Sequence, residues 1–86
     1  MAAILIVDDE PDMRRSLRAL LARYGHQTLE AGSGEEALTI LSARRPDLML
    51  LDLRLPGMDG QEILGQVRTR YAALPVIVIT GYKLGV

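Results

Sequence analysis

Four oxygen-bearing side chains stand at the ends of apolar runs. Asp8 and Asp9 follow the first run, Asp52 follows a second, and Thr80 closes a third. Continuous runs rich in Ile, Val and Leu are typical of strands that are covered on both faces in a parallel sheet. Because the carboxyl ends of such strands meet at one edge of an open α/β sheet, we expect the three carboxylates and the hydroxyl to lie together there.

Three carboxylates at one edge would repel one another strongly. At ~4 Å and an effective dielectric constant of ~20, one pair costs on the order of 4 kcal/mol. A divalent cation relieves this repulsion, and oxygen-only ligands in a chain without cysteine favour magnesium (Mg2+) or manganese over zinc. A metal beside a carboxylate nucleophile supplies the charge neutralisation and in-line positioning that phosphoryl transfer to aspartate requires.

The elements that must position these side chains alternate between strands and helices. Strands are predicted at Ala3–Val7, Gln27–Ala31, Leu48–Leu51 and Pro75–Thr80. Between them, apolar residues recur at the spacing of one helix face in three stretches. The order β-α-β-α-β-α-β predicts an open parallel α/β sheet with right-handed crossovers. The half-polar second strand is expected at an edge of that sheet.

Local signals predict where the helices begin and end. Pro11 suits the first turn of the first helix, and Gly25 is expected just after its end. Ser33 and Glu36 have the spacing of a capping box, and Asp59 is expected to cap the third helix.

The first helix carries Arg14, Arg15, Arg18 and Arg23 between its apolar residues. We expect these arginines to form a solvated face, with a partner surface as the alternative. His26 is expected at the surface or at the start of the second strand, because no partner ligand for a metal is apparent.

Composition narrows the functional class. The 86 residues allow one domain over 1–86, and 49% apolar residues suffice for a packed core. A net charge of −1 gives no sign of affinity for nucleic acid or membranes. The first apolar run is too short for a signal peptide or a membrane span. The absence of cysteine is compatible with a reducing cytosol, and we expect a cytoplasmic protein.

Three segments together resemble the receiver domain of response regulators in two-component signalling. They are IVDDE at 6–10, LLDLRLPGMDG at 50–60 and PVIVITG at 75–81, which match the family in order, spacing and strand context. The resemblance covers the chain up to Gly81. It implies a flavodoxin-like, doubly wound parallel sheet with strand order 2-1-3-4 in this chain, without the last helix-strand-helix of the receiver fold.

The resemblance also implies a role for each site residue. Asp52 would be the phosphoacceptor in a phosphorelay, with a sensor histidine kinase as the donor and Mg2+ as the cofactor. Asp9 and Asp52 would bind Mg2+ directly, the backbone carbonyl of Arg54 would be a third ligand, and Asp8 would act mostly through water. Thr80 would contact the phosphoryl group. Such a receiver catalyses only its own modification, so we do not class it as an enzyme.

The chain departs from the family pattern near its end. Receivers carry a lysine at the end of a fifth strand, and that role is not assigned to Lys83, which is only three residues past Thr80. We therefore expect a C-terminally truncated receiver whose apolar edge at Val76–Ile79 is exposed and invites self-association. The alternative function is a truncated receiver that accepts no phosphate and serves as a dimerisation module or is an inert fragment.

Simpler interpretations stay open for the individual residues. Asp52 could cap the turn that follows it, and Asp8 or Asp9 could cap the helix that begins near Pro11. Thr80 could satisfy backbone groups at a strand end. An aspartate-nucleophile phosphohydrolase is disfavoured because such enzymes place a second aspartate two residues after the nucleophile, where this chain has Arg54.

Overall fold

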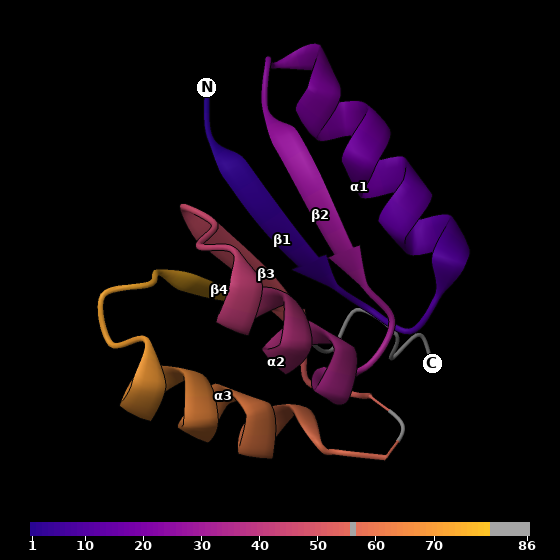
Figure 1. Ribbon diagram of the computed structural model, residues 1–86. Helices are drawn as coiled ribbons and strands as arrows, with labels where there is room; N and C mark the ends of the chain where they lie inside the picture. Colours follow the sequence, from indigo (N-terminus) through magenta and orange to yellow (C-terminus); the bar gives the residue numbers. More distant parts are fainter. Residues whose placement is uncertain (56, 80–86) are drawn as a thin grey trace.

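In the part of the chain that the structure describes, four parallel strands form a single sheet in the order β2-β1-β3-β4 (Figure 1). The structure is a computed structural model that describes residues 1–55 and 57–79. Its elements are β1 (Ala3–Val7), α1 (Pro11–Arg23), β2 (Gln27–Ala31), α2 (Gly34–Ala43), β3 (Leu48–Asp52), α3 (Gly60–Arg70) and β4 (Val76–Ile79). The predicted order of strands and helices is confirmed, as is the position of the half-polar β2 at an edge.

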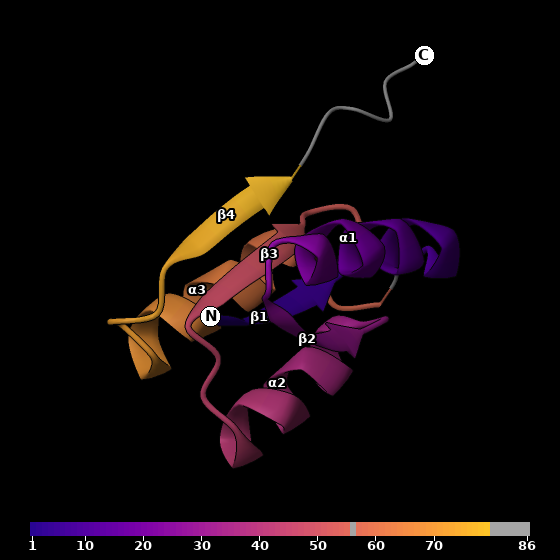
Figure 2. The same ribbon diagram turned by 90° about the horizontal axis from the view of Figure 1, so that it is seen from above.

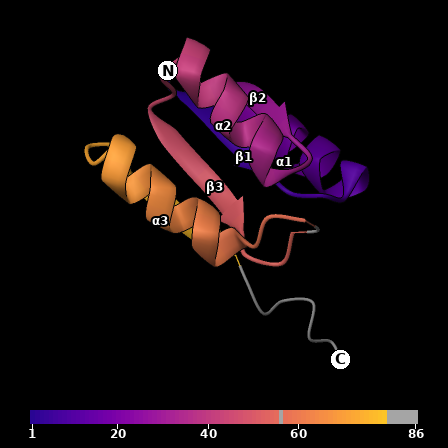
Figure 3. The ribbon, with the colours of Figure 1, turned by 60° about the horizontal axis from the view of Figure 1, so that its bottom comes forward.

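The helices lie in two layers around the sheet. Seen from above, α1 covers one face, and α2 and α3 cover the other (Figure 2). Figure 3 shows α2 and α3 in front of the sheet, with α1 behind it. The main hydrophobic core lies on the side of α2 and α3, and its buried members are Leu5, Val7, Ala31, Ala37, Leu41, Met49, Leu51, Leu55, Ile63 and Val67. The core is aliphatic, as a chain without Phe or Trp requires.

The opposite face of the sheet is covered only in part. Helix α1 contacts β1 and β2, and none of its residues is fully buried. Leu20 on this helix is 48% exposed. On β4, the outer strand of the described sheet, Ile77 is 52% exposed and Val78 is 36% exposed. Of the predicted apolar edge at Val76–Ile79, the two middle residues are therefore exposed, and Val76 and Ile79 are partly buried.

The predicted helix ends are confirmed by specific hydrogen bonds. The Oγ of Ser33 accepts a hydrogen bond from the backbone N–H of Glu36, which caps α2. The carboxylate of Asp59 accepts one from the N–H of Gln61, which caps α3. Gly25 follows α1 with a φ of +83°, a conformation that suits glycine after a helix.

Among residues 1–55 and 57–79, no helix combines the length and the apolar character that are needed to cross a bilayer.

Candidate metal centre

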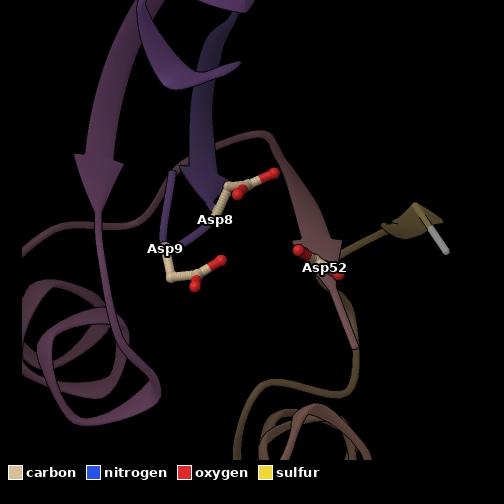
Figure 4. A group of neighbouring side chains, drawn as sticks. All are labelled: Asp8, Asp9 and Asp52. Atoms are coloured by element: carbon tan, nitrogen blue, oxygen red, sulfur yellow. The ribbon is translucent and has the colours of Figure 1, made fainter. Parts of the chain in front are cut away.

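Three carboxylates converge at the carboxyl ends of β1 and β3. In Figure 4, the side chains of Asp8 and Asp9 point toward Asp52 across the space between these two ends. One carboxylate oxygen from each residue lies within 4.8 Å of the others. Asp8 and Asp52 are buried, whereas Asp9 is exposed, so the cluster faces solvent on the side of Asp9. The predicted convergence of these three residues is confirmed.

The pairing of two central strands explains why residues far apart in sequence meet here. In the parallel ladder, Val7 pairs with Leu51; Asp8 is the residue that follows β1, and Asp52 is the last residue of β3. Val7 and Leu51 are buried in the hydrophobic core, which fixes the register of both strands. The core therefore sets the separation of the two buried aspartates, and Asp9 joins them from the loop that follows.

Each buried aspartate is oriented by a backbone N–H two residues later. Asp8 Oδ1 accepts a hydrogen bond of 2.9 Å from the N–H of Glu10. Asp52 Oδ1 accepts one of 2.9 Å from the N–H of Arg54. These are Asx-type turns. Asp52 thus caps the turn that follows it, as one interpretation predicted, and it is also a member of the acidic cluster.

The alternative that Asp8 or Asp9 caps the start of α1 is confirmed in part, and only for Asp8. The N-cap residue is Glu10, and it makes no side-chain cap hydrogen bond. The side chain of Asp8, two residues before Glu10, accepts a hydrogen bond from the backbone N–H of Glu10.

The donor set fits a hard divalent cation. All three candidate ligands are carboxylate oxygens, and the group contains neither nitrogen nor sulfur. Mg2+ binds oxygen at about 2.1 Å, commonly through one or two carboxylates, and keeps several waters. Oxygens within 4.8 Å of one another can therefore share one such ion, directly or through its waters.

Some predicted site residues are not placed relative to this cluster. Thr80 lies outside the described residues, as does Lys83, to which no role is assigned. Arg54 follows β3 and binds Asp52 through its N–H, but the assignment of its carbonyl as a metal ligand stays a prediction.

The sequence-based interpretation missed Arg14. Its guanidinium was expected on a solvated face, yet the side chain is only 20% exposed. Nη1 donates a hydrogen bond of 2.6 Å to the backbone carbonyl of Asp8, and Nε lies 3.3 Å from a carboxylate oxygen of Glu30. Arg18, one turn along α1, binds the other oxygen of Glu30 at 2.9 Å. An acidic residue in the strand after an arginine-bearing helix was the one sequence signal for this contact.

His26 is also more engaged than expected. It is half-buried, and its Nδ1 accepts a hydrogen bond of 3.1 Å from the backbone N–H of Ala2. It lies at the amino-terminal end of the strands, away from the acidic cluster, so the interpretation as a structural residue holds.

Comparison with known proteins identifies the family of this chain. The model of the response regulator receiver domain family matches residues 4–84. Sporulation initiation phosphotransferase F of Bacillus subtilis is 44% identical over 79 residues, which cover 92% of this chain and 64% of that protein. This chain thus spans just under two thirds of that relative.

Solved structures agree with this result. The response regulator protein TrrA of Thermotoga maritima, crystallised in complex with Mg2+-BeF, superposes with a TM-score of 0.91 at 37% identity. The alignment covers 98% of this chain and 73% of that one. A chain from the complex of histidine kinase ThkA with TrrA gives a TM-score of 0.89 at 38% identity, covering 95% of this chain and 71% of that one. By family match, fold and acidic cluster alike, this chain belongs to the receiver domain family of response regulators.

Proposed function

We propose that this receiver accepts a phosphoryl group on Asp52, with Mg2+ held at the acidic cluster. The observation that carries the proposal is the convergence of three carboxylates within 4.8 Å at the ends of β1 and β3. The three carboxylates repel one another, and a cation bound between them would offset that electrostatic repulsion.

The chain's own residues have distinct tasks in this proposal. Asp9 and Asp52 would hold Mg2+ directly, with the carbonyl of Arg54, and Asp8 would act through water. When bound, the ion would neutralise charge on the transferring phosphoryl group. The N–H of Arg54 fixes the Asp52 carboxylate by binding Oδ1, so that its orientation is set before a donor arrives.

The step itself is a displacement at phosphorus. A carboxylate oxygen of Asp52 forms a bond to the phosphorus of a phosphohistidine, and the P–N bond breaks. The electron pair of that bond stays on the imidazole nitrogen. A sensor histidine kinase is proposed as the donor, which the complex of ThkA with TrrA supports by similarity. We place this exchange in the cytoplasm, with which the absence of cysteine is compatible.

Intact-protein mass spectrometry tests the proposal. The chain is incubated with an acyl phosphate and Mg2+, and the expected product carries one phosphoryl group. The adduct should be absent from Asp52→Asn and should form much more slowly when Mg2+ is removed with a chelator. Asp47→Asn is the matched control, because Asp47 binds the backbone N–H of Ala3 through its carboxylate and is not part of the cluster.

The two outcomes lead to different functions. A single adduct that depends on Asp52 would establish the phosphoacceptor. A folded chain that stays unmodified would overturn it and favour the interaction module, since the family membership does not depend on the chemistry.

Self-association through β4 is a second, independent proposal. Among the described residues β4 is an outer strand, and its exposed Ile77 and Val78 make that edge apolar. Unpaired backbone groups along such an edge can pair with the same strand of another copy. We therefore expect the backbone of residues 76–79 in one copy to pair with the same residues of a second copy.

A further inference from the structure

We propose that Arg14 is a positioning residue that holds the Asp8–Asp9 peptide in the orientation needed by the acidic cluster. This inference rests on the proposed function, because it treats the cluster as the Mg2+ site. The guanidinium spans two elements, since Nη1 binds the carbonyl of Asp8 at 2.6 Å and Nε lies 3.3 Å from Glu30 on β2.

The contact matters because of which carbonyl it holds. The C=O of Asp8 and the N–H of Asp9 belong to one planar peptide unit. Fixing the direction of that carbonyl therefore fixes the plane from which the Asp9 backbone continues. Asp9 is the exposed member of the cluster and lies outside β1, so no ladder hydrogen bond of that strand sets its position.

The backbone of Asp8 is held on its other side as well. Its N–H donates a hydrogen bond of 3.1 Å to the carbonyl of Ala31 at the end of β2. Its side chain holds the N–H of Glu10 at 2.9 Å. With the guanidinium on its carbonyl, Asp8 becomes a fixed point from which the Asp9 carboxylate reaches Asp52. Of these three hydrogen bonds, only the one from Arg14 is made by the side chain of another element.

The surroundings of the guanidinium restrict where it can go. A Cβ atom at Gly32 would lie 3.2 Å from Nη1, so glycine at this position leaves the space that the guanidinium occupies. Glu30 anchors the same group from β2. Only arginine has a planar set of donors that can reach both a carbonyl and a carboxylate from one side chain.

Arg18 provides a matched control within the same helix. It carries the same charge and binds the same Glu30, at 2.9 Å, whereas the hydrogen bond to the Asp8 carbonyl comes from Arg14. Arg14→Gln and Arg18→Gln therefore remove equal charge from one ion-pair group, and only the first removes the contact to the Asp8 carbonyl. Arg14→Lys keeps the charge but offers a single ammonium in place of the planar guanidinium.

Two measurements decide the question. In calorimetric titration with Mg2+ alone, Arg14→Gln and Arg14→Lys should bind about 10- to 100-fold more weakly, the range for loss of groups that orient metal ligands. Arg18→Gln should stay within about fivefold of the parent chain, as for an exposed ion pair. In metal-free protein, amide hydrogen exchange at Asp9 and Glu10 should be faster in both Arg14 variants and unchanged in Arg18→Gln. Circular dichroism confirms that each variant is folded, and Arg14→Lys serves if Arg14→Gln is not.

The alternative is a purely electrostatic role, and it predicts the opposite pattern. A cation near the cluster would then repel Mg2+, so that both glutamine variants would bind more tightly and Arg14→Lys would be unchanged. That pattern, or unchanged exchange at Asp9 in the Arg14 variants, would overturn the inference. Failure of the parent chain to bind Mg2+ would instead count against the proposed function, and the exchange data would still decide whether Arg14 positions Asp9.

Discussion

Gly60 packs directly on the backbone of Leu53, and this contact closes the loop between β3 and α3. The N–H of Gly60 donates a hydrogen bond of 3.2 Å to the carbonyl of Leu53. A Cβ atom added to Gly60 would overlap the Cα and carbonyl of Leu53. The loop that follows Asp52 thus returns to within one residue of it, and glycine is what permits the approach.

Gly60→Ala should therefore destabilise the fold. Overpacking of this kind costs about 1–3 kcal/mol, and here the obstructing atoms are backbone, which no change of rotamer can move aside. We expect a lower midpoint in urea denaturation. Gly65→Ala is the control in the same helix, because its Cβ would meet nothing within 4 Å. It should raise stability by up to about 1 kcal/mol through helix propensity. Equal effects of the two changes would show that the contact with Leu53 is unimportant.

Much of the fold could be predicted because apolar runs and helical periodicity report burial. The convergence of Asp8, Asp9 and Asp52 followed from topology alone, since parallel strands end at one edge. Neither the prediction of the fold nor that of the acidic cluster depended on particular side-chain contacts, and the structure confirms both.

Arg14 could not be predicted in the same way. Periodicity shows that Arg14 and Arg18 share one face of α1, but the direction of that face depends on how the helix packs over β2. The partner Glu30 lies 16 residues further along the chain, beyond the reach of local spacing rules. The partial exposure of β4 was predictable only from the strand order, because its apolar composition alone indicates burial.

Ser33→Ala should weaken the start of α2. The Ser33 Oγ accepts a hydrogen bond of 3.1 Å from the N–H of Glu36, while the Glu36 carboxylate accepts one of 2.6 Å from the N–H of Gly32. Loss of an N-cap side chain costs about 1 kcal/mol, measurable as a lower free energy of unfolding in urea. Ser33→Thr should keep most of that stability, because its hydroxyl can accept the same bond. If alanine and threonine behave alike, the cap contributes nothing.

Ile77→Lys should weaken self-association. A lysine on an outer strand places charge where a second copy would pair, and natural proteins use this device to block edge pairing. In sedimentation velocity at micromolar concentration, we expect the parent chain to show dimers that are lost in the variant. Ala43→Lys, at an exposed position at the end of α2, adds the same charge away from the edge and should leave the dimers intact. A parent chain that is monomeric throughout would contradict the proposal.

Asp52→Asn should stabilise the metal-free chain and reduce the stabilisation that Mg2+ provides. Without the ion, the substitution removes one of three clustered negative charges while its side-chain oxygen can still accept the hydrogen bond from Arg54. The free energy of unfolding should rise by about 1–4 kcal/mol. This range is the repulsion between two carboxylates ~4 Å apart, which is ~1 kcal/mol at an effective dielectric constant of ~80 and ~4 kcal/mol at ~20. With Mg2+ at about 100 times its dissociation constant, the parent chain should gain ~2.7 kcal/mol, and the variant much less.

Asp12→Asn separates this effect from a general change in net charge. Asp12 lies in the first turn of α1, its side chain is 94% exposed, and it is outside the cluster. Its substitution changes the net charge equally, yet it should leave the Mg2+-dependent gain intact and should not raise stability in chelator. Urea denaturation of the three chains, each with Mg2+ and with chelator, gives the six values required. If Asp12→Asn raised the metal-free stability as much as Asp52→Asn does, the repulsion would belong to the whole molecule rather than to the carboxylates at the ends of β1 and β3.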